Sequence, residues 1–151
     1  MQKIDTAIIT INQVIDKNID NYNSDRGFLS QNIMSQLRNF VEHVSLKAYS
    51  NGQDIEVEYE NINKALVYVN STAKFKFLNK FHKFLQPVAS HYTLDEENSE
   101  RLMLKYYEYL LKIKAYLKNT FNLDVLENID KFPINIDSTT KEYYEKIAKK
   151  I

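Results

Sequence analysis

Cysteine is absent from this 151-residue chain, and glycine and proline occur only twice each. Without cysteine there is no disulfide bond, no catalytic thiol and no metal site with cysteine ligands. Glycine and proline mark turns, so their scarcity indicates few turns and favours a few long helices over a β-sandwich. A chain of this length is large enough to bury a core as a single domain.

An excess of charge of either sign is also absent, because 20 basic side chains balance 20 acidic ones. The chain therefore has no overall basic field that would drive non-specific binding to nucleic acid, and any contact with RNA must be local. The first ten residues lack a basic segment followed by an apolar run, so we expect no signal peptide. No apolar run approaches the roughly 20 residues that span a bilayer. We expect a cytoplasmic protein with no membrane partner.

Apolar residues recur every three or four positions along most of the chain, which predicts amphipathic helices. The clearest series is Ile4, Ile8, Ile11, Ile15 and Ile19. The expected helices cover residues 4–21, 28–49, 61–70, 74–92 and 94–119, and a last one begins near residue 139. A turn is expected at 21–27 and a short extended piece at 55–60. The predicted fold class is all-α, a helical bundle of about five helices.

Residues that begin or end helices support these boundaries. Gly52 is a candidate C-cap, and Pro87 is expected to kink or end its helix. Two pairs have the spacing of a capping box, which places a hydroxyl before a helix and an acid three residues later: Thr93 with Glu96, and Thr139 with Glu142.

The chain is expected to divide near residue 122. Residues 1–122 would form one helical domain, and residues 123–151 a connector followed by a C-terminal helix. The last helix ends at "KKI" without a closing signal. We therefore expect the natural chain to continue, with this part belonging to a larger protein.

The helix predicted at 28–49 carries a cluster of polar residues in the stretch "RNFVEH". At about 100° per residue, Arg38 and His43 fall on opposite borders of the polar face, about 140° apart. Asn39 and Glu42 lie between them. Residues four apart on a helix can touch, which pairs Asn39 with His43 and Arg38 with Glu42. The four side chains are predicted to form one polar ridge.

These residue types suit the cleavage of RNA by its own 2′-hydroxyl. That reaction needs a proton removed from the hydroxyl, a proton given to the leaving 5′-oxygen and charge stabilised at phosphorus. Histidine suits the proton transfers because its pKa lies near neutrality. Arginine offers the phosphate a two-pronged donor that stays charged. One helix supplies one such histidine. If two copies of the chain pack helix against helix, the homodimer has an acid and a base on either side of one phosphate.

The stretch "RNFVEH" resembles the Arg-x4-6-His motif of HEPN domains, in the Arg-Asn-x3-His form of HEPN ribonucleases. That family includes RNA-targeting CRISPR nucleases and many toxin and anti-phage proteins. The resemblance implies an all-helical, dimeric, metal-independent ribonuclease with its motif at the dimer interface. It also implies that Arg38 and His43 are catalytic and that Asn39 supports them. From their positions on the helix, we further expect Glu42 to hold Arg38 or His43.

Two departures separate this chain from parts of that family. The motif comes early, in the second predicted helix, whereas many family members carry it later. In the toxin branch that pairs with nucleotidyltransferases, a tyrosine follows the histidine by two places, and here that place is Ser45. Control by transfer of AMP to such a tyrosine is therefore not expected. The competing interpretation is a surface pair of Arg38 and Glu42 beside an incidental His43.

Other polar and aromatic groups are expected to be structural. His82 and His91 lie in contexts that favour packing over catalysis. The stretch "KFKFLNKFHKF" mixes lysine with phenylalanine, which suits either an RNA-binding surface or core phenylalanines with lysines in water, and we favour the second. No metal-ligand spacing and no glycine-rich phosphate loop is present, so no metal and no cofactor is expected.

Two hypotheses follow from the sequence. The first is a HEPN-like, dimeric, metal-independent endoribonuclease that binds RNA and serves bacterial defence or toxicity. The second is a non-catalytic helical module for dimerisation, nucleotide binding or partner binding at the N-terminus of a larger protein.

Overall fold

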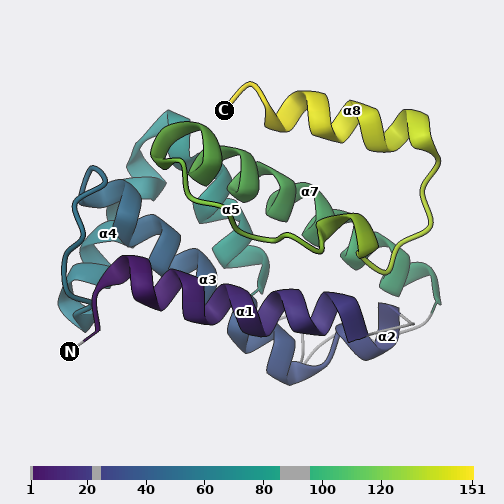
Figure 1. Cartoon of the computed structure of the whole chain (residues 1–151), viewed down its shortest axis with the longest axis horizontal. Helices are drawn as coiled ribbons and strands as arrows, with labels where there is room; N and C mark the ends of the chain where they lie inside the picture. The colour runs from purple at the N-terminus through teal and green to yellow at the C-terminus, as the bar shows by residue number, and fades with distance from the viewer. Residues whose placement is uncertain (1, 22–24, 86–95) are drawn as a thin grey trace.

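The computed structural model describes residues 2–21, 25–85 and 96–151. These residues form a helical bundle, which confirms the predicted all-α class (Figure 1). Within them, six α-helices have ten or more residues: α1 (Ile4–Asn21), α3 (Gln31–Tyr49), α4 (Tyr59–Ser71), α5 (Lys76–Leu85), α7 (Glu96–Phe121) and α8 (Ser138–Ala148). Three short helical segments connect them: α2 (Asp25–Phe28), η1 (Ala73–Phe75) and η2 (Ile129–Lys131).

Helix α3 is the centre of one half of the bundle, because α1, α4 and α5 all pack against it. The predicted isoleucine series of α1 is buried on this side, with every member at most 7% exposed. All residues from His43 to Ala48 are buried, so the C-terminal half of α3 is covered on every side. Helix α7 forms the other half, and α8 lies along it at the edge of the molecule (Figure 1).

Several predicted boundaries were wrong by a few residues, for identifiable reasons. Helix α3 begins at Gln31 rather than Phe28, because the Ser30 hydroxyl accepts a hydrogen bond from the Ile33 amide and caps the helix. Helix α8 is capped by the Asp137 carboxylate, which accepts from the Thr140 amide, and not by the predicted Thr139. Thr93, Pro87 and His91 lie outside the described residues.

The end of α3 uses two residues with left-handed backbone. Asn51 (φ 57°) donates its amide to Ala48, and Gly52 (φ 84°) donates to Lys47, the pattern of a Schellman cap. A Cβ at Gly52 would lie 2.7 Å from a ring carbon of Phe121, so glycine is required there. The extended piece predicted at 55–60 was only partly right: a single antiparallel bridge joins Lys3 to Glu56, but α4 already begins at Tyr59.

The connector that follows α7 is fastened to α1. Three polar residues spaced four apart on α1 form hydrogen bonds with the connector: Asn12, Asp16 and Asp20. The Asn12 amide oxygen accepts from the Leu126 amide at 2.7 Å. The two oxygens of Asp16 accept from the amides of Glu127 and Asn128 at 2.9 and 3.1 Å. The connector thereby contributes the buried residues Val125, Leu126, Ile129 and Phe132 to the common core.

Among the described residues, no helix combines the length and apolar character that crossing a membrane requires.

Candidate active site

Helix α3 carries all four residues of the predicted polar ridge, but their exposure differs. Arg38 is exposed, Asn39 and Glu42 are half-buried, and His43 is only 7% exposed. The predicted open ridge is therefore correct for Arg38 and wrong for His43. The cause is that three helices, α1, α4 and α5, pack against α3. Together they cover more of its surface than its apolar stripe, so the solvent-exposed face of α3 is narrower than predicted.

The imidazole of His43 is held by its own helix. Its Nδ1 lies 2.7 Å from the main-chain carbonyl oxygen of Asn39. A carbonyl oxygen only accepts, so Nδ1 carries the hydrogen and donates it. In the neutral ring the lone pair then belongs to Nε2, which is the state a general base needs. The group that holds the His43 ring is the main-chain carbonyl of residue 39, which any residue type would supply, so the expected role of the Asn39 side chain stays a prediction.

Glu42 pairs with a histidine from another helix. Its Oε2 accepts a hydrogen bond at 3.0 Å from Nε2 of His82, on α5. This hydrogen bond lowers the pKa of the Glu42 carboxyl, while burial acts in the opposite direction. Electrostatic interactions with His82, Arg38 and His43 lower the pKa of the Glu42 carboxyl further. Glu42 is therefore a carboxylate at neutral pH, close to three cationic or titratable groups.

The predicted partner of Glu42 was wrong, since its hydrogen bond goes to His82 and not to Arg38 or His43. Within the described part of the chain, the Arg38 guanidinium forms no ion pair and no side-chain hydrogen bond. It contributes to Glu42 only through its charge. An exposed guanidinium without a fixed carboxylate partner is available to bind a phosphate.

His82 is the residue that sequence reasoning assigned only to packing. It is buried, with 6% of its surface exposed, and it joins α5 to α3 beneath the ridge. The available signal was its position four residues after Leu78 and next to Phe81, both fully buried, which places it on the core side of α5. The sequence did not predict which helix α5 packs against, because Glu42, the partner of His82, is 40 positions away.

The mixed lysine and phenylalanine segment has the structural arrangement that we favoured. Phe75 and Phe81 are buried, and Phe77 and Phe84 pack against the core, whereas the lysines at 74, 76, 80 and 83 are exposed. Ser45, which stands where one HEPN branch has tyrosine, is fully buried and donates to the Val41 carbonyl. Among the described residues, no three His, Asp or Glu side chains gather as a metal site would require.

No protein-family model matches the chain, and neither a curated protein nor a solved structure matches it. The resemblance to HEPN domains therefore rests on the motif and the helical fold class alone.

Proposed function

We propose that the protein is a HEPN-like, metal-independent endoribonuclease that acts as a homodimer, with Arg38 and His43 as its catalytic residues. One observation carries the proposal beyond the sequence motif. The Nδ1 hydrogen of His43 is committed to the Asn39 carbonyl at 2.7 Å, which assigns the basic lone pair of the neutral ring to Nε2. The motif arginine stands on the same helix, exposed and without an ion-pair partner among the described residues.

In the proposed reaction, the 2′-oxygen of a ribose attacks the adjacent phosphorus and the bond to the 5′-oxygen breaks. His43 of one protomer accepts the proton of the 2′-hydroxyl at Nε2. The protonated His43 of the second protomer gives its proton to the departing 5′-oxygen. Arg38 donates hydrogen bonds to the phosphate oxygens as charge develops there. The products are a 2′,3′-cyclic phosphate and a 5′-hydroxyl, and no metal ion takes part.

The need for two chains follows from the geometry of α3. Arg38 and His43 point about 140° apart on the same helix, so one chain does not direct both at one phosphate without help. A two-fold axis near α3 would bring His43 of each chain toward the same scissile bond. Because His43 is only 7% exposed within a single chain, this interface must form around the small part of the residue that remains exposed.

The family resemblance implies a role in bacterial defence or toxicity, and this role is part of the proposal.

A second candidate function is a non-catalytic dimerisation or partner-binding module. The observation that favours it is the pairing of Glu42 with His82, which makes part of the ridge a structural link between α3 and α5. In this case the exposed Arg38 would bind a partner and not a scissile phosphate.

The experiment that separates the two functions is incubation of the protein with long single-stranded RNA in EDTA, followed by analysis of the product ends. The proposal predicts cleavage that EDTA does not reduce, with 2′,3′-cyclic phosphate and 5′-hydroxyl ends. A folded dimer that cleaves no RNA would support the interaction module. Cleavage that stops in EDTA, or leaves 3′-hydroxyl ends, would contradict the proposed chemistry.

A further inference from the structure

Helix α5 places the imidazole of His82 against the carboxylate of Glu42, inside the polar ridge of α3. The two groups lie 3.0 Å apart, and because a carboxylate only accepts, Nε2 of His82 donates the hydrogen bond. Both side chains are largely enclosed, with 7% of His82 and 24% of Glu42 exposed. A carboxylate that is partly withdrawn from water depends on its donors, since an unsatisfied acceptor there is costly.

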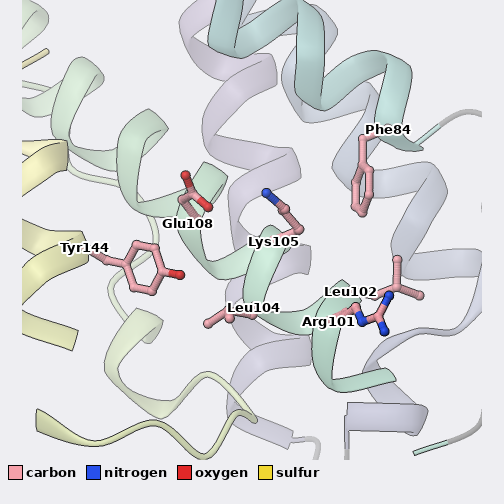
Figure 2. Close-up of a pocket in the computed structure, with 7 residues that line it drawn as sticks. All are labelled: Phe84, Arg101, Leu102, Leu104, Lys105, Glu108 and Tyr144. Atoms are coloured by element: carbon pink, nitrogen blue, oxygen red, sulfur yellow. The ribbon is translucent and has the colours of Figure 1, made fainter. Parts of the chain in front are cut away.

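Aromatic residues of α7 fix the position of α5 around this hydrogen bond. Phe81 stacks on Tyr109 with ring centres 4.7 Å apart, and Phe84 packs edge-to-face on Tyr106 with ring centres 5.6 Å apart. The side chain of Phe84 points from the end of α5 toward α7 (Figure 2). Because Phe81 and Phe84 flank His82 in the sequence, α7 holds the imidazole at one place beside α3.

Arg38 is the second possible partner of the same carboxylate. It precedes Glu42 by four residues on α3, the spacing at which two side chains of one helix can touch. The positive charge of Arg38 already acts on the Glu42 carboxyl and lowers its pKa. The hydrogen bond nevertheless goes to His82, and Arg38 is exposed without an ion pair to any residue that the structure describes.

The choice between these two partners decides whether Arg38 is available. A guanidinium that pairs with a carboxylate offers its two-pronged donor to that carboxylate, and a phosphate would have to compete for the same hydrogen atoms. A carboxylate one turn away from a phosphate ligand is therefore a competitor of the phosphate unless another donor holds it. His82 supplies that donor.

We propose that His82 is a positioning residue of the nuclease site: by holding the Glu42 carboxylate, it leaves Arg38 free to bind a phosphate of the RNA. This inference rests on the proposed function, because it takes Arg38 as the phosphate ligand. His82 itself does not contact the RNA. The competing explanation is that His82 only links α5 to α3, in which case Glu42 has no part in the effect of removing it.

The test is the affinity of the full chain for single-stranded 2′-O-methyl RNA, measured by fluorescence anisotropy. This RNA lacks the attacking hydroxyl, so it binds without being cleaved. His82→Leu should weaken binding by at least about fivefold, because the released carboxylate captures Arg38. In a Glu42→Gln background the same replacement should change the affinity by less than about twofold, since no carboxylate remains to compete. Equal weakening in both backgrounds would overturn the proposal.

Two amide variants form a matched pair that differs only in reach. The longer side chain of His82→Gln can still donate to Glu42 and should bind the RNA like wild type. The shorter side chain of His82→Asn does not reach the carboxylate and should bind as weakly as His82→Leu. Equal affinities for the two amide variants would contradict the proposal. The pair also keeps the test valid if His82→Leu does not fold.

A crystal structure of His82→Leu separates a failure of this inference from a failure of the proposed function. It should show the Arg38 guanidinium within hydrogen-bond distance of the Glu42 carboxylate, and this result needs no RNA. If wild type binds no RNA, the proposed function is wrong, and the crystal structure still decides whether His82 controls the pairing. If wild type binds RNA and Arg38 stays unpaired in the variant, the proposed function stands and the inference is wrong.

Discussion

Replacing His43 by alanine is expected to lower the rate of RNA cleavage by at least about 100-fold, the usual size of a general acid or base contribution. The effect should lie at the upper end of that range, because one residue type supplies both the base and the acid in the proposed dimer. The measurement is the initial cleavage rate of a labelled single-stranded RNA in EDTA, at equal concentrations of wild type and variant.

Loss of cleavage has this meaning only if the variant folds. His43→Gln keeps most of the side-chain volume and can still hydrogen-bond, so it should preserve the packing of the buried site while lacking a base of suitable pKa. Arg38→Lys keeps the charge but loses the bidentate donor, and it should reduce the cleavage rate less than His43→Ala does.

Lys80→Ala, at an exposed position on α5, serves as the control and should cleave RNA at the wild-type rate. Wild-type rates for both His43 variants would remove His43 from the mechanism.

Replacing Asp16 by alanine is expected to lower the free energy of unfolding by about 3 kcal/mol, since two hydrogen bonds to a charged acceptor are lost. Asp16 is 9% exposed, and its carboxylate accepts hydrogen bonds from the amides of Glu127 and Asn128, which would otherwise remain without partners at the edge of the core. Loss of these bonds should release the connector from α1. The measurement is urea unfolding followed by circular dichroism.

The matched control for Asp16 stands one turn later on the same helix face. Asp20 pairs with Lys131 at 2.9 Å, but both side chains are largely solvated, at 46% and 64% exposure. Asp20→Ala should therefore change the free energy of unfolding by less than about 1 kcal/mol. If Asp20→Ala proves as destabilising as Asp16→Ala, burial of the Asp16 carboxylate is not what fastens the connector.

Local patterns predicted the helices well where an apolar stripe alternates with solvated residues. The isoleucine series of α1 is the example, because all five of its residues lie in that helix and are buried. Apolar stripes did not predict accurately where the helices begin. Phe28 and Leu29 continue the apolar pattern of α3, so only the cap at Ser30 shows that the helix starts later. The capping residue of a helix is the polar residue whose backbone is extended, as Asp137 is before α8. The spacing of polar residues in the sequence does not show which of several candidates adopts that backbone.

Helix spacing predicted which positions of α3 lie within reach of one another, but not what surrounds them. His43 contacts position 39 because residues four apart meet within one helix, although the contact is with the main-chain carbonyl and not with the Asn39 side chain. The link between Glu42 and His82 depends on how α5 docks against α3, which is a property of the whole bundle. The burial of His43 has the same origin. Long-range packing therefore decides which members of a polar ridge face water.

The central claim is that two chains build one site, and the most direct measurement is RNA cleavage by wild type mixed with His43→Ala after the subunits have exchanged. With wild type held constant in EDTA, an equal amount of variant should lower the rate to about one half, and a ninefold excess to about one tenth, as random pairing of subunits requires. A cleavage rate that stays constant under a ninefold excess would show that each chain carries a complete site, and would contradict the account.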